Sequence, residues 1–315
     1  MPVQVSCAAS FRGLLAWIAG SRHPSVGPGG LDCALRTTPP VARAARIHLL
    51  GPSEAHCTVK REIEFLPIKT YVFDTASEAI ESAAREIANL IRTLKYQRHD
   101  AVLGMTTGEA LRPFYSKLIE MSGEEEKGGL PISGVRTFMH EELVGPAARS
   151  EGSLMGWIES ALYPEWPVPE ANRNFLDGAG ADLDAVCGAY EEQLKNVGPV
   201  DFMLVPLGKS GRLGLNEPGT DPGERTRVVD LSDGTKQELG EAHPGLEIPD
   251  RALTLGPASI RGAKRLRVYA FGADVADVVE AGMLPEPDPE HPLSFVAGHK
   301  NVELLLDSAA ASALE

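Results

Sequence analysis

Short apolar stretches alternate with segments of helical periodicity from residue 64 to the C-terminus. Strands are predicted at 68–73, 101–105, 135–139, 201–207, 265–271 and 302–306. Helices are predicted at 75–94, 111–119, 153–162, 182–197 and 273–281. Such alternation is typical of βαβ units, so we expect an α/β fold whose mostly parallel sheet is covered by helices on both faces.

Local signals refine this pattern at a few places. Thr75 and Glu78 have the spacing of a capping box at a helix N-terminus. Residues 219–250 are rich in Gly, Pro and acidic residues and have little periodicity, which predicts a long loop. Residues 123–129 predict an acidic surface loop.

Three predicted strands end in polar or glycine-containing segments. These are Thr106-Thr107-Gly108, His140-Glu141-Glu142 and the stretch 208–218. Ligands of open α/β sheets bind at the carboxyl ends of the strands. The three segments therefore predict a binding crevice at one edge of the sheet.

The first segment leads from a strand into a helix. Backbone N–H groups and hydroxyls at such a place favour a phosphate or carboxylate, so Thr106, Thr107 and Gly108 could cradle an anion. Glu109 follows at once, and its carboxylate would repel a phosphate. Three interpretations of this segment stay open: an altered anion-binding site, a binding site for a neutral ligand, or an ordinary capped turn between the strand and the helix.

The second and third segments carry titratable groups. Glu141 or Glu142 in a half-buried crevice could act as a general base. A metal site is disfavoured, because three consecutive side chains point in different directions; a solvated strand end is the plain alternative. In the third segment Gly208 and Gly211 allow a tight turn, and Glu217 can pair with Arg212.

Composition and charge narrow the classes of function. The 315 residues are 43% hydrophobic and carry a net charge of −14. So acidic a chain is unlikely to grip nucleic acid or an anionic membrane through its overall field. The sequence holds no apolar run of about 18 residues, which argues against a spanning helix.

The N-terminal segment differs from the rest of the chain. Residues 1–60 hold six basic and two acidic side chains, and three of the four cysteines. This segment is an organelle-targeting peptide, a secretory signal or a poorly ordered extension that begins at an upstream start codon. We therefore divide the chain into an extension, 1–62, and a domain, 63–315. With a single cysteine in the domain, a reducing, cytoplasmic compartment fits best.

Six segments of the domain resemble the superfamily of glucosamine-6-phosphate deaminase/isomerase and 6-phosphogluconolactonase. They are 103–108, 137–145, 207–218, 224–227, 252–256 and 299–307. Asn216-Glu217-Pro218 and Val144-Gly145 are nearer to the deaminase branch than to the lactonases. The resemblance implies a three-layer sandwich with a Rossmann-like sheet, as in glucosamine-6-phosphate deaminase, ribose-5-phosphate isomerase and CoA-transferases.

The resemblance also implies a chemistry. Such deaminases act on an amino-sugar phosphate and use no metal or organic cofactor. A His, supported by an acid, opens the sugar ring, and an Asp then moves the C2 proton before ammonia leaves. Glu141 stands where this Asp belongs, and Glu217 matches the supporting acid. The implied substrate-binding positions are Thr106, Thr107, Gly108, Gly208, Ser210, Gly211 and Arg227. Deaminases of this kind often form homo-oligomers, and the same is expected here.

The sequence departs from the family at the ring-opening and phosphate-binding positions. Arg212 replaces the ring-opening His, and an arginine stays protonated near neutral pH. Glu109, Glu241 and Val275 fall at positions where the family binds phosphate. Two hypotheses follow: a divergent enzyme with Glu141 as proton shuttle and Arg212 and Glu217 positioning the substrate, or a non-catalytic sugar-binding or regulatory relative. A lactonase, a hydrolase, is a weaker third because it would lack the same His.

Overall fold

The computed structural model describes residues 61–63, 66–97, 99–123 and 129–314. Most of the predicted extension, and most of the predicted acidic loop at 123–129, lie outside these residues. Arg61 and Glu62, which the sequence placed in the extension, belong to the first strand. The division of the chain at residue 62 otherwise stays a prediction.

An eight-stranded sheet forms the centre of the domain, in the order β1-β2-β11-β10-β7-β3-β4-β6. Its strands are β1 (Arg61–Ile63), β2 (Lys69–Phe73), β3 (Val102–Met105), β4 (Arg136–Met139), β6 (Arg173–Asn174), β7 (Phe202–Pro206), β10 (Leu266–Ala270) and β11 (Val302–Asp307). All neighbouring strands pair in parallel except β1, which pairs with β2 in antiparallel fashion. The predicted mostly parallel sheet is confirmed.

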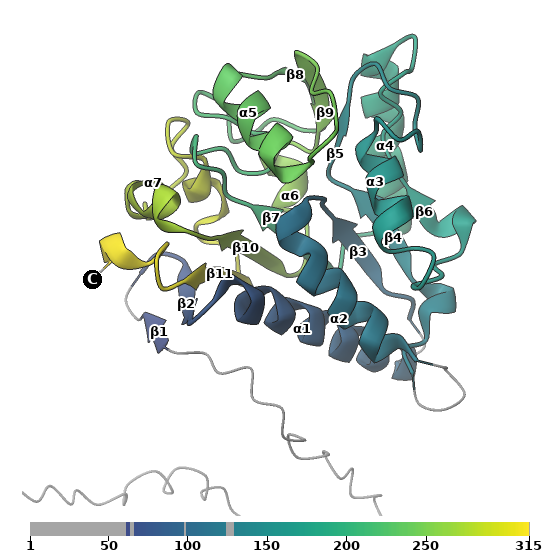
Figure 1. Ribbon diagram of the computed structural model, residues 1–315, viewed down its shortest axis with the longest axis horizontal. Coiled ribbons are helices and arrows are strands. Elements are labelled where there is room, and N and C mark those ends of the chain that lie inside the picture. The colour runs from purple at the N-terminus through teal and green to yellow at the C-terminus, as the bar shows by residue number, and fades with distance from the viewer. Residues whose placement is uncertain (1–60, 64–65, 98, 124–128, 315) are drawn as a thin grey trace, which may run out of the picture. The chain divides into compact units, whose positions relative to one another are not determined.

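Helices cover both faces of this sheet, and Figure 1 shows α1 and α2 lying across one of them. The helices are α1 (Ala76–Tyr96), α2 (Arg112–Ser122), α3 (Leu154–Ala161), α4 (Leu183–Val197), α5 (Asp233–Ala242), α6 (Pro257–Ile260) and α7 (Ala276–Ala281). Among these described helices none is long and apolar enough to cross a membrane.

Alternating strand residues divide the core into two clusters. In β7, Phe202 and Leu204 belong to the cluster beneath α1, α2 and α3, whereas Met203 and Val205 belong to the one beneath α4, α6 and α7. Successive side chains of a strand point to opposite faces, so a strand buried on both faces must be apolar throughout. The three-layer arrangement follows from this constraint.

Helix α1 starts where the sequence predicts. The Thr75 hydroxyl accepts a hydrogen bond from the backbone N–H of Glu78 at 3.2 Å, and the Glu78 side chain accepts one from the N–H of Thr75. One buried face of the helix, including Ile80, Ile87 and Ile91, then packs on the sheet. The capping box and the apolar periodicity together fix this element.

The predicted long loop at 219–250 is wrong in part. It contains the strand β8 (Arg227–Asp230) and the helix α5, whose N-cap Ser232 accepts a hydrogen bond from the N–H of Thr235 at 3.2 Å. With β5 (Glu141–Leu143) and β9 (Arg251–Thr254), β8 forms a three-stranded antiparallel sheet in the order β5-β9-β8. The short elements bury few apolar residues, and this hides their periodicity.

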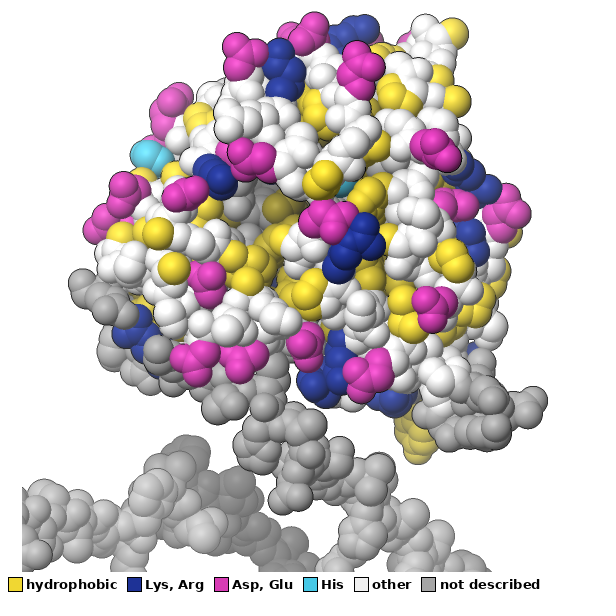
Figure 2. Space-filling model, viewed as in Figure 1, with side chains coloured by type: hydrophobic (Ala, Val, Ile, Leu, Met, Phe, Trp, Pro, Cys, Tyr) yellow, Lys and Arg dark blue, Asp and Glu magenta, His cyan; other side chains and the backbone are white. Residues whose placement is uncertain are grey.

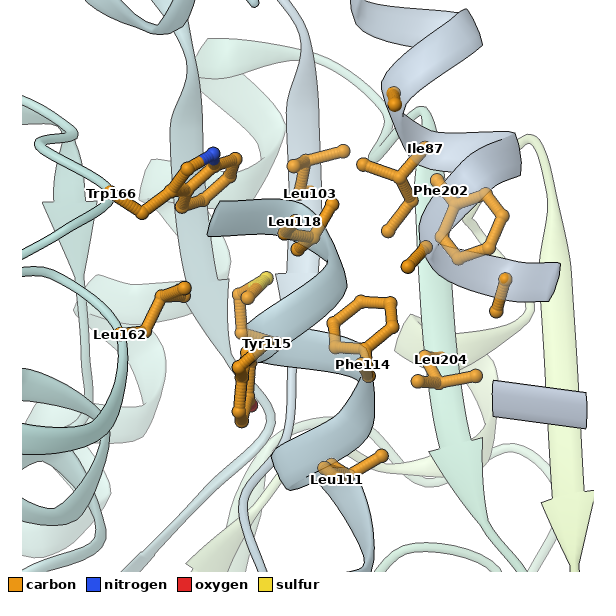
Figure 3. Packing of buried hydrophobic residues seen from close by; sticks show 14 of the residues in the cluster. Ile87, Leu103, Leu111, Phe114, Tyr115, Leu118, Leu162, Trp166, Phe202 and Leu204 are labelled. Carbon is orange, nitrogen blue, oxygen red and sulfur yellow. The ribbon is translucent and has the colours of Figure 1, made fainter. Parts of the chain in front are cut away.

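Aromatic side chains fill the space between α1, α2 and the sheet. Figure 3 shows Phe114 and Tyr115 of α2 lying among Leu103, Phe202 and other apolar residues of the same cluster. Phe202 is fully buried there.

We expect Phe202→Ala to lower the free energy of unfolding by about 3–5 kcal/mol, because a large cavity opens in a packed core. Tyr96→Ala, at a side chain that is 84% exposed, is the matched aromatic control and should change it by less than about 0.5 kcal/mol. Urea unfolding followed by circular dichroism measures both. Equal effects of the two substitutions would contradict this view of the core.

Candidate active site

The carboxyl ends of β3, β4 and β7, which are neighbours in the sheet, meet at one cavity. Its volume is about 290 Å³. Figure 2 shows a hollow in the molecular surface. In Figure 1, which has the same view, this place lies below α5 and beside α7. Residues that line the cavity include Thr107, Gly108, Glu109, Glu141, Gly208, Lys209, Arg212, Glu238, Glu241, His243, Tyr269 and Val275. The three predicted segments are therefore brought together.

Glu141 is the first residue of β5 and is almost fully buried at the cavity wall. Its Oε1 accepts a hydrogen bond from the Thr106 hydroxyl at 2.8 Å. Its Oε2 has no hydrogen-bond partner among the described residues. Burial raises the pKa of the Glu141 carboxyl, and the Thr106 hydrogen bond and the Arg212 charge oppose this shift only in part. One carboxylate oxygen is thus held in place while the other is free to meet a ligand.

Glu142 points away from the cavity and serves the start of α3. Its two oxygens accept hydrogen bonds from the backbone N–H groups of Leu143 and Leu154, both at 2.8 Å, and of Met155 at 2.9 Å. A carboxylate at this place satisfies N–H groups that a helix leaves unpaired. Burial still raises the pKa of Glu142 to about 7. Of the two candidate bases, only Glu141 faces the cavity.

His140 is buried behind the sheet end and takes no part in the cavity. Neither ring nitrogen has a hydrogen-bond partner among the described residues, and burial lowers the pKa of the imidazole to about 3. A Cβ at Gly104 would lie 2.7 Å from its Nε2, so this glycine makes room for the ring. His140, Glu141 and Glu142 diverge, as expected for consecutive residues.

Arg212 is buried and held by an acid that the sequence did not predict. Its Nε donates to Oε2 of Glu238, from α5, at 3.1 Å, and its Nη1 donates to the carbonyl oxygen of Gly214 at 2.5 Å. The predicted pair of Arg212 with Glu217 does not form. A Cβ at Gly208 would lie 2.7 Å from Nε of Arg212, so a glycine there lets the guanidinium approach the backbone.

Glu217 instead binds the N-cap residue of α5, Ser232. Its Oε1 accepts hydrogen bonds from the N–H and the hydroxyl of Ser232, both at 3.0 Å. Asn216 accepts a hydrogen bond from Nη1 of Arg227 at 2.8 Å. Ser210 donates its backbone N–H to Glu238 at 2.7 Å.

Four predicted site residues do not line the cavity. They are Ser210, Gly211, Glu217 and Arg227. The remaining predicted residues line the cavity, except Thr106, which holds Glu141 from behind.

His243 is a cavity residue that the sequence analysis missed. Its Nε2 lies 2.8 Å from the Thr107 hydroxyl and its Nδ1 lies 3.0 Å from the Leu239 carbonyl oxygen. The carbonyl can only accept, so Nδ1 carries the proton and Nε2 accepts from Thr107. Burial lowers the pKa of His243, which keeps the ring neutral. A lone His in a Gly- and Pro-rich stretch gave no signal for this role.

The buried His140 gives a prediction about stability. Its pKa is about 3 in the folded chain against 6.5 when exposed, so the unfolded chain binds a proton that the folded chain excludes. Stability from this residue is complete above pH 6.5 and is lost as pH falls toward about 3, with a slope of up to ~1.4 kcal/mol per pH unit.

We expect His140→Leu to remove this slope from the free energy of unfolding. Urea unfolding at several pH values between 4 and about 7.5 measures it. The difference between variant and unaltered chain isolates His140 from the opposite contribution of Glu142. Parallel curves for the two proteins would show that His140 is not excluded from protonation.

The chain is similar to known proteins over most of its length. The family described as "Glucosamine-6-phosphate isomerases/6-phosphogluconolactonase" matches residues 74–305. Glucosamine-6-phosphate deaminase of Bacillus velezensis is 31% identical over 233 residues, which cover 73% of this chain and 95% of that protein. The deaminase of Rhodopirellula baltica is 32% identical over 236 residues, covering 75% and 93%.

Solved structures give the same result. A monomeric glucosamine-6-phosphate deaminase superposes with a TM-score of 0.71 at 28% identity, covering 78% of this chain and 99% of that one. The 6-phosphogluconolactonase of Trypanosoma brucei reaches 0.61 at 22% identity, over 78% and 98%, and shares the fold. The chain belongs to the glucosamine-6-phosphate isomerase/6-phosphogluconolactonase family.

Proposed function

We propose that this protein is a divergent deaminase/isomerase of sugars or amino sugars, in which Glu141 moves the proton at C2. The observation that carries the proposal is the Glu141 carboxyl at the cavity wall, with one oxygen held by Thr106 and the other unpartnered. A general base needs this combination of fixed geometry and a free oxygen.

Burial suits Glu141 to this task. Burial raises the pKa of Glu141, and a carboxylate with a raised pKa is a stronger base than an exposed one. Removal of the C2 proton from an open-chain amino sugar gives an enediol-type intermediate. The proton on Glu141 can then return to C1, which leaves an imine at C2, and the addition of water to this imine releases ammonia and leaves the ketose.

Arg212 acts in this scheme as a positioning group and not as a base. The guanidinium keeps its protons near neutral pH, and Glu238 and the Gly214 carbonyl fix its orientation. From the cavity wall it can hydrogen-bond a substrate oxygen on which negative charge develops. Since it cannot open a sugar ring by taking a proton, the enzyme acts on the open-chain form.

A second function is a sugar-binding or regulatory protein without turnover. The buried ion pair of Arg212 with Glu238 favours it, because the resemblance implies that Arg212 replaces the family's ring-opening His. The cavity and its Glu141 would then serve only for binding.

The test is turnover by the purified full chain, assayed as ammonia release and ketose formation from glucosamine and from glucosamine 6-phosphate. Glu141→Gln keeps the shape of the side chain but removes the base, so we expect a loss of about 10²–10⁴-fold in kcat. In the unaltered chain, kcat should rise with pH as Glu141 ionises, with a midpoint above that of an ordinary carboxyl.

Glu165→Gln is the matched control, because Glu165 is exposed and does not line the cavity. It should leave kcat unchanged. Full activity of Glu141→Gln would contradict the role of Glu141. An inactive unaltered chain that binds sugar saturably in calorimetry would support the second function.

A further inference from the structure

We infer that the cavity binds a sugar that carries no phosphate, either uncharged or with an ammonium group such as that of an amino sugar. The inference deepens the proposed function, on which it rests for the sugar itself. It is drawn from the charges that line the cavity, from how they are paired and from the free oxygen of Glu141.

Carboxylates outnumber cations on the cavity wall. Four lining residues are acidic: Glu109, Glu141, Glu238 and Glu241. Two are basic: Lys209 and Arg212. The neutral His243 adds no positive charge to this wall. A phosphate dianion would enter a cavity whose own charge is negative, and like charges at close range cost free energy.

Both lining cations are already engaged. Nζ of Lys209 lies 3.1 Å from Oε2 of Glu241 and 3.4 Å from Oδ2 of Asp274. Nε of Arg212 lies 3.1 Å from Oε2 of Glu238. Each cation is already compensated by a carboxylate, so a phosphate that hydrogen-bonded to it would also lie near that negative charge.

The segment that could cradle an anion is followed directly by a carboxylate, which is paired with Arg112. Thr107 and Gly108 line the cavity, and Glu109 is the first residue of the helical turn that follows them. Oε1 of Glu109 accepts from Nη2 of Arg112 at 2.6 Å, which fixes the carboxylate there. The N–H groups that would meet a phosphate thus lie beside a negative charge.

Glu141 independently indicates what the cavity holds. Its Oε2 is buried, lies at the cavity wall and lacks a hydrogen-bond partner among the described residues. A buried acceptor of this kind is costly unless a ligand donates to it. Sugar hydroxyl and ammonium groups are such donors, so this oxygen indicates that the sugar part of the ligand, and not a phosphate group, lies against Glu141.

The experiment compares the dissociation constants of glucosamine and glucosamine 6-phosphate for the full chain by calorimetry, at low and at high salt. We expect glucosamine to bind more tightly. Added salt should narrow the difference, because it screens both the attraction of the ammonium group and the repulsion of the phosphate.

Charge-neutralising variants sharpen the test. Glu109→Gln and Glu241→Gln should each improve the binding of glucosamine 6-phosphate relative to glucosamine by up to about fivefold, since each removes one negative charge from the cavity wall. Glu165→Gln, remote from the cavity, should leave the ratio unchanged. Tighter binding of glucosamine 6-phosphate by the unaltered chain, or no binding of either sugar, would overturn the inference.

The calorimetric experiment tests the inference separately from the proposed function, because it measures affinity and not turnover. A preference for glucosamine without any turnover supports the inference and contradicts the catalytic role of Glu141. Turnover that depends on Glu141, together with tighter binding of glucosamine 6-phosphate, supports the catalytic role and overturns the inference.

Discussion

The hydrogen bond between the Thr106 hydroxyl and Glu141 is the interaction on which the site depends. It joins the end of β3 to the start of β5, and so links the central parallel sheet to the small antiparallel sheet. Burial of a carboxylate is costly unless its oxygens are satisfied. In Glu141 one oxygen is satisfied by the protein and the other is left to the cavity. The same desolvation raises the pKa of this group, which suits it to the role of base that we propose.

An ion pair lies beside this carboxylate at the cavity wall. Arg212 stands in the glycine-rich loop and pairs with Glu238 of α5, so loop and helix are tied by a buried ion pair. Breaking such a pair leaves an uncompensated buried charge, which is strongly destabilising. Gly208 permits this contact, since a Cβ there would overlap the pair. The loop is therefore built around an arginine, and its geometry accommodates a permanent cation rather than a base.

The sequence predicts the elements with local signals and fails where the signal is long-range. The Thr75–Glu78 capping box, and the apolar strand whose Phe202 and Met203 face opposite layers, are readable from spacing alone. The convergence of the three strand ends follows from the geometry of a parallel sheet. The partner of Arg212 does not, because Glu238 lies 26 residues away on a helix that the sequence presents as loop. His243 escaped prediction for the same reason, since only the placement of α5 brings it to Thr107.

The central claim is that the free oxygen of Glu141 faces the reacting carbon of a sugar in this cavity. A crystal structure of the full chain soaked with glucosamine measures it most directly. We expect the sugar to lie between Glu141 and Arg212, with C2 beside Oε2 of Glu141 and its ammonium group near a lining carboxylate. A sugar bound elsewhere, or bound in the cavity with C2 turned away from Glu141, would contradict it.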